Sequence, residues 1–177
     1  MFSFHHVFLI IVEYHVGKKK KTNHLDILMD YFLELHQAPN NQRLLIIVTH
    51  GFIELLLNSI IDIKCKNGKN VITQNNRDFP LSVKLVILHE LNILDDRLYE
   101  ILDWFRKVRN RAAHEPFFNL KTSDINYANS VLDRFIPNET LYKPDDFFHF
   151  CALLVGTIWN ENLTLMNQVF GLDNNEF

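Results

Sequence analysis

His114 is the residue whose type and position point most directly to chemistry. It ends a predicted amphipathic helix that begins at Asp95 and Asp96, because Pro116 disfavours helical backbone at the residue before it. The dipole of a helix stabilises a cation at the C-terminus, so an imidazole there tends to stay protonated. A protonated imidazole suits a general acid. The structural alternative is that His114 is only a favourable cation at a helix end.

Arg109 and Glu54 are charged residues in apolar surroundings. At about 100° per residue, Arg109 falls within the apolar stripe of its helix, and Glu54 lies in the most apolar stretch of the chain. A buried charge is costly unless it is paired and hydrogen-bonded, so we predict that the two residues meet. The alternatives are that Arg109 extends past the edge of the core and that Glu54 is a rim carboxylate. His50 precedes Glu54 by one turn and could line the same pocket, or be a hydrogen-bonded core histidine.

The spacing of Arg109 and His114 decides whether their side chains can act on the same bound molecule. Five residues correspond to about 140° around an ideal helix, so the two side chains do not share a face unless the helix unwinds near its end. Pro116 favours such unwinding. Asn110 and Arg111 point away from the apolar stripe.

No metal or nucleotide motif is present. His89 and Glu90 do not form HExxH because residue 93 is Ile, and His149 lies two residues from Cys151, which is the wrong spacing for one metal site on a helix. The sequence has neither GxGxxG nor GxxxxGK[ST]. We therefore expect no metal and no cofactor.

The elements that position these residues are predicted to be helices. Apolar periodicity, caps and prolines predict six, which we expect to form an all-α, up-and-down bundle of about five to six helices in a single domain over residues 22–171. Residues 1–21 are an N-terminal extension of uncertain role, residues 172–177 a polar tail, and residues 64–78 a predicted loop. The predicted helices span residues 22–35, 44–63, 79–91, 95–114, 122–135 and 144–166.

Composition and charge restrict the possible partners. The net charge of -3 and the pI near 6.3 exclude binding to nucleic acid by bulk charge, so any such contact needs a local basic patch.

The apolar run at residues 8–12 precedes four lysines, which is the reverse of a signal peptide, and it is too short to span a bilayer. The two cysteines form no CxxC pair. We expect a cytoplasmic protein without membrane contact.

Residues 109–114, Arg-Asn-Arg-Ala-Ala-His, resemble the Arg-x4–6-His motif of the HEPN superfamily, including its polar residue after the arginine. The lead-in also agrees: Phe79-Pro-Leu-Ser-Val-Lys-Leu, Leu91-Asn-Ile-Leu-Asp and the helix before the motif resemble mannitol-operon-repressor-like HEPN proteins. His50-Gly-Phe-Ile-Glu-Leu-Leu-Leu resembles the central helix of those proteins. The resemblance covers about residues 40 to 120.

The resemblance implies a helical bundle that forms a homodimer with the motif helices side by side. Many members are metal-independent endoribonucleases, often toxins or defence effectors. Carried over by residue, Arg109 would bind the scissile phosphate, His114 would be general acid or base, and Asn110 would position one of them. Each chain would supply one of the two histidines that the reaction needs. The residues that would add a local positive field for RNA are Arg106, Lys107 and Arg111.

Three functions remain open at this point. The first is the endoribonuclease, with RNA as substrate and an antitoxin as a candidate partner. The second is a non-catalytic HEPN module that regulates transcription through protein contacts, since nothing in the sequence resembles a helix-turn-helix. The third is a plain helical bundle in which Arg109, Glu54 and His114 are core and cap residues.

Overall fold

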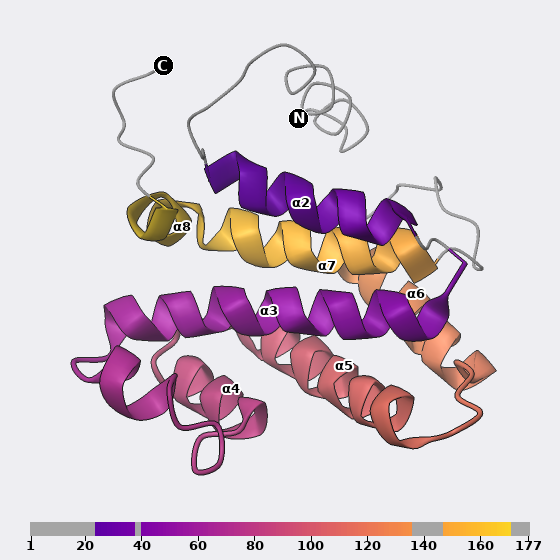
Figure 1. The fold of residues 1–177 in the computed structure, drawn as a ribbon, viewed down its shortest axis with the longest axis horizontal. Coiled ribbons are helices and arrows are strands. Elements are labelled where there is room, and N and C mark those ends of the chain that lie inside the picture. Colours follow the sequence, from indigo (N-terminus) through magenta and orange to yellow (C-terminus); the bar gives the residue numbers. More distant parts are fainter. Residues whose placement is uncertain (1–23, 38–39, 136–146, 171–177) are drawn as a thin grey trace.

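The protein folds into a bundle of helices (Figure 1). A computed structural model describes residues 24–37, 40–135 and 147–170, and within these ranges every regular element is helical. The all-α class is therefore confirmed, while the predicted N-terminal extension and polar tail lie outside the described residues. The elements are α2 (His24–Gln37), α3 (Gln42–Lys64), the π-helix η1 (Gly68–Ile72), α4 (Leu81–Glu90), α5 (Asp96–His114), α6 (Thr122–Phe135), α7 (Phe147–Glu161) and α8 (Leu163–Phe170).

Helix α3 runs through the middle of the bundle (Figure 1). It contacts α2, α7 and α8 on one side and α4 and α5 on the other. The Asn41 side chain caps it by accepting a hydrogen bond from the Leu44 N–H at 3.0 Å. Because apolar residues occur almost all around α3, its burial requires helices on several sides. In the described residues it is the one helix that is long and apolar enough to cross a membrane, but half of its most apolar window is buried within the fold.

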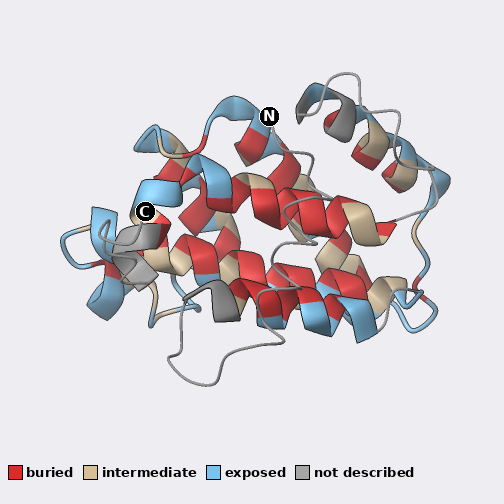
Figure 2. Ribbon diagram, turned by 90° about the horizontal axis from the view of Figure 1, so that it is seen from above, coloured by how far each residue is buried: buried red, intermediate tan, exposed pale blue. Residues whose placement is uncertain are grey.

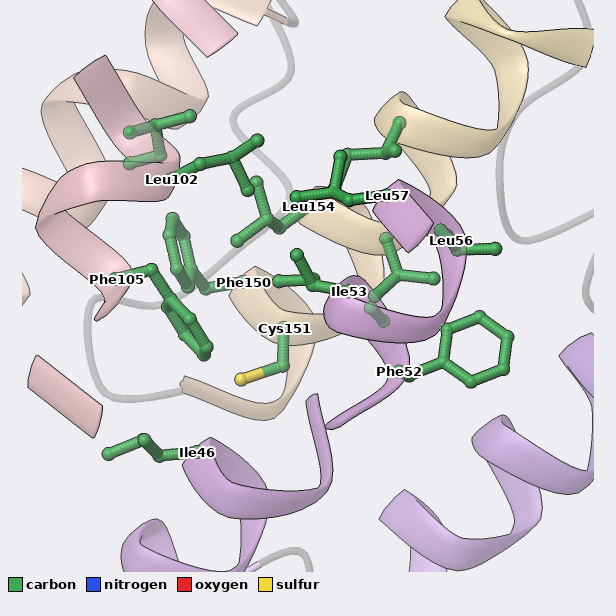
Figure 3. Packing of buried hydrophobic residues seen from close by; sticks show 14 of the residues in the cluster. Ile46, Phe52, Ile53, Leu56, Leu57, Leu102, Phe105, Phe150, Cys151 and Leu154 are labelled. Atoms are coloured by element: carbon green, nitrogen blue, oxygen red, sulfur yellow. The ribbon is translucent and has the colours of Figure 1, made fainter. Parts of the chain in front are cut away.

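The core is continuous between α3, α5 and α7. Figure 2 shows the buried residues on the inward faces of these helices, and Figure 3 shows the side chains that meet there. Phe105 of α5 lies 6.2 Å from Phe150 of α7 between ring centroids, close to the aliphatic side chains of α3. This packing fixes the rotation of α5 about its axis, and therefore the side on which its polar residues emerge.

Two elements differ from the predicted ones. The segment predicted as a loop contains η1, which packs on the end of α3, and Gly68 allows this approach because a Cβ there would overlap the Ile61 carbonyl. The predicted last helix is two helices, α7 and α8. Asn162 stands between them and its side-chain amide donates to the Ile158 carbonyl at 3.0 Å, a local hydrogen bond that competes with helical pairing.

Two adjacent leucines of α3 test which face of this helix is buried in the core. Leu56 is fully buried, whereas Leu55 is 43% exposed. We expect Leu56→Ala to lower the free energy of unfolding by about 2–5 kcal/mol, because it leaves a cavity in the core. Leu55→Ala should cost less than about 1 kcal/mol. Urea denaturation of both variants measures this, and equal losses would contradict the arrangement of α3.

Candidate functional site

A cavity of about 300 Å³ lies where the middle of α3 meets the start of α4 and the second half of α5. It brings together five of the residues selected from the sequence, from two helices about fifty residues apart. The same cavity includes residues that sequence reasoning did not select, from the segment before α4 and from its first turn. The lining residues are His50, Glu54, Asn76, Pro80, Leu81, Ser82, Arg106, Arg109 and Asn110.

Arg109 is the basic residue of this cavity for which the described part of the chain supplies no carboxylate partner. Arg109 is half-buried as a residue, and within the described residues its one polar contact is Nη1 donating to the Asn110 Oδ1 at 3.4 Å. The other arginines and the lysine of α5 each contact a carboxylate: Arg97 contacts Asp95, Arg106 and Lys107 share Asp103, and Arg111 contacts Asp124. The uncompensated charge of Arg109 therefore makes this point of the cavity attractive to an anion.

Glu54 pairs with Lys84 of α4 instead of with Arg109. The Lys84 Nζ lies 3.5 Å from the Glu54 Oε1 and donates to the Asn76 Oδ1 at 2.6 Å. The prediction of a direct Glu54–Arg109 pair was therefore wrong, although both residues line one cavity. Lys84 is fully buried, at three residues after Leu81 and four before Leu88, both of which are buried. That spacing on one apolar stripe was the available signal that a lysine would need a carboxylate.

His50 lines the cavity as a neutral imidazole. Only 7% of the residue is exposed, and burial lowers its pKa to about 4, with Arg109 and then Arg106 acting in the same direction and Glu54 opposing them. No hydrogen bond to the ring is found within the described part of the chain. The imidazole is therefore available to donate or accept one hydrogen bond toward a bound molecule.

His114 lies outside the cavity. Helix α5 stays α-helical through His114, and the Glu115 N–H donates to the Arg111 carbonyl at 2.9 Å. Helix α5 therefore does not unwind before His114, so the condition for a shared face is not met, and His114 remains about 140° around the helix from Arg109. Its side chain is exposed. One chain consequently holds an arginine-lined cavity and an exposed histidine on different faces of the same helix.

Arg43 holds the end of α5 in place, a role that sequence reasoning missed. Its guanidinium donates to the carbonyl oxygens of Glu115 and Pro116, directly after His114. Gln42 beside it accepts a hydrogen bond from the Leu120 N–H. Because both contacts involve backbone groups of a distant loop, no side-chain pattern in the sequence could reveal them.

The predicted positive field is weaker than its residue count suggests. Arg106 and Lys107 share Asp103, and Arg111 donates to the Asp124 Oδ2 at 2.6 Å, with its guanidinium 5.8 Å from the centroid of the Phe118 ring. Arg111 is thus tied to the start of α6 and is absent from the cavity lining, as is Lys107. The described residues contain no group of three or more His, Cys, Asp or Glu side chains that could hold a metal ion.

Comparison with known proteins assigns neither a family nor a function to the chain. No protein-family model matches the chain, and searches of curated proteins and of solved structures find no match either. The function therefore has to be argued from the cavity, the motif helix and their chemistry.

The lowered pKa of His50 makes stability depend on pH. Below the ordinary value of 6.5 the unfolded chain takes up a proton that the folded chain does not bind until the pH approaches 4. Acidification therefore favours unfolding, and we expect His50 to account for a loss of about 2 kcal/mol between pH 7 and pH 5.

Urea denaturation at several pH values measures this loss. The variant His50→Gln should show a shallower dependence over that range. The control is His36→Gln, which removes an exposed histidine. An unchanged pH dependence in His50→Gln would contradict the buried, neutral state of this imidazole.

Proposed function

We propose that the protein is a metal-independent endoribonuclease of HEPN type that acts as a homodimer. The observation that carries this proposal is Arg109, which lines a cavity without a carboxylate partner among the described residues, on the helix that ends in His114. The motif resemblance of residues 109–114 supports the same assignment. A toxin or defence role in the cytoplasm, with an antitoxin as protein partner, belongs to this proposal.

Arg109 binds the scissile phosphate. A phosphodiester carries one negative charge, and the planar guanidinium donates two parallel hydrogen bonds to its oxygens. As the phosphorus becomes five-coordinate the negative charge on these oxygens grows, so a fixed cation stabilises the transition state more than the ground state. Asn110 contacts Arg109 and also lines the cavity, which places it to orient the guanidinium or a phosphate oxygen.

The reaction uses the nucleophile that RNA itself contains. The ribose 2′-oxygen attacks phosphorus while a base removes its proton, and the bond to the 5′-oxygen breaks as an acid protonates that oxygen. The products are a 2′,3′-cyclic phosphate and a 5′-hydroxyl, so the step consumes neither water nor a metal. One neutral and one protonated imidazole satisfy both proton transfers.

The position of His114 makes a second chain necessary. In one chain His114 lies on a different face of α5 from Arg109, and each chain supplies only one motif histidine. A two-fold arrangement with the α5 helices side by side brings both histidines to the phosphates held by Arg109. Arg43 fixes the backbone directly after His114 and so limits the positions this imidazole can take.

A second candidate function is a non-catalytic HEPN module that regulates through protein contacts, as the resemblance to mannitol-operon-repressor-like proteins suggests. It is favoured by an exposed apolar stripe on α3, formed by Leu44, Ile47 and Leu55, each at least 40% exposed. Such a stripe is suited to a partner helix. It fits a regulatory or antitoxin partner equally well, so it does not replace the first proposal.

Cleavage of a mixed RNA pool in EDTA tests the nuclease proposal. Wild type should cut, and His114→Ala and Arg109→Ala should each lose at least about 100-fold in rate, because they remove the proton-transfer group and the phosphate-binding cation. Arg97→Ala is the matched control, because Arg97 lies on the same helix and pairs with Asp95 away from the cavity. Inert wild type, or full activity of His114→Ala, would overturn the proposal.

Mixing the same preparations tests the shared site. After subunit exchange between equal amounts of wild type and His114→Ala, about a quarter of the dimers hold two intact histidines, so activity should fall to about a quarter of that of the same total amount of wild type. A fall to one half would show that each chain acts alone.

A further inference from the structure

The charges around the cavity match one negative charge on a ligand. Lys84 pairs with Glu54, and Arg106 pairs with Asp103, which Lys107 also contacts from outside the lining. His50 is uncharged near neutral pH because its pKa is about 4. Within the described residues, Arg109 is thus the one charged side chain of the lining that contacts no oppositely charged group. A nucleotide within an RNA strand carries one negative phosphodiester charge, which the guanidinium of Arg109 can contact.

The same cavity holds hydrogen-bond acceptors beside its cation. Glu54 is 29% exposed while it contacts Lys84, so its carboxylate still reaches the cavity. His50 lines the same wall one helical turn away, is more than nine-tenths buried and has no hydrogen-bond partner within the described residues. Pro80 and Leu81 add an apolar surface at the start of α4. The cavity therefore offers a cation for a phosphate, an apolar wall for a flat ring and a carboxylate for N–H groups.

We propose that this cavity is a guanine subsite, in which Glu54 accepts hydrogen bonds from the base while Arg109 holds the adjoining phosphate. Guanine carries two adjacent N–H donors, N1–H and the N2 amino group, which match the two oxygens of a carboxylate. Adenine, cytosine and uracil each place an acceptor beside their donor, and a carboxylate repels that acceptor. The volume of about 300 Å³ is at the lower end of the range for small-ligand sites, which suits one nucleoside and not a longer fragment.

The subsite deepens the proposed function and rests on it, because it assumes that Arg109 holds an RNA phosphate. It adds a base preference next to the cleaved bond. Lys84 is a positioning residue in this arrangement: it is fully buried, and it holds both Glu54 and Asn76 at the cavity wall.

Calorimetric titration with the four 2′,3′-cyclic nucleoside monophosphates tests the subsite, since each probe carries a single phosphodiester charge. We expect wild type to bind the guanosine compound at least about tenfold more tightly than the other three. Glu54→Met, which removes both oxygens at similar length, should abolish this preference. Arg109→Gln should weaken all four probes and preserve their order. Glu90→Met is the control, because Glu90 is an exposed carboxylate of α4 outside the cavity lining.

The Glu54→Met change leaves the buried Lys84 without its carboxylate, so folding needs a separate check. The double variant Glu54→Met with Lys84→Met removes both charges together, and circular dichroism reports whether it folds. It should also lose the guanine preference. Equal affinities of wild type for the four probes would overturn the proposal, as would a preference that persists in both the single and the double variant.

The binding and cleavage experiments distinguish a failure of the guanine subsite from a failure of the proposed nuclease function. If the guanosine compound is preferred while RNA stays intact, the subsite stands and the proposed cleavage does not. If RNA is cut and the four probes bind alike, the nuclease stands and the guanine subsite is wrong.

Discussion

The burial of α3 is the constraint on which the rest of the structure depends. This helix is apolar almost all around, so α2, α7 and α8 must cover one side and α4 and α5 the other. His50 and Glu54 lie on the side of α3 that faces α4 and α5, where Glu54 contacts Lys84 of α4. The cavity forms there, since the polar residues of three helices converge without filling the space.

The parts of the fold that follow from local sequence could be predicted. Asp95 caps α5 as its position before an amphipathic stretch suggests, with its carboxylate accepting from the Leu98 N–H. The break at Asn162 could not be predicted, because asparagine is compatible with both a helix interior and a helix end. The π-helix at Gly68 could not be predicted either, since it depends on a close approach to the end of α3.

The candidate site also has features that the sequence could predict and features that it could not. The burial cost of Glu54 and Arg109 predicted that the two residues meet; they line one cavity without pairing, because the partner of each depends on how the helices cross. Lys84 contacts Glu54 because α4 packs against both α3 and α5, and in the described ranges no carboxylate then contacts Arg109. Because no described carboxylate contacts Arg109, its guanidinium can bind an anion. A paired arginine would be structural, whereas an unpaired one beside a neutral imidazole and a compensated carboxylate is prepared for an anion.

The most direct test is the binding of an RNA oligonucleotide with 2′-deoxy substitutions, which prevent cleavage, measured by fluorescence anisotropy. Wild type is compared with Arg109→Gln and with Arg97→Gln, a change on the same helix at an arginine that is already paired. Loss of a charge-assisted contact should raise the Kd of Arg109→Gln at least about tenfold, while Arg97→Gln stays close to wild type. Equal Kd values for wild type and Arg109→Gln would show that the uncompensated charge of Arg109 does not bind RNA.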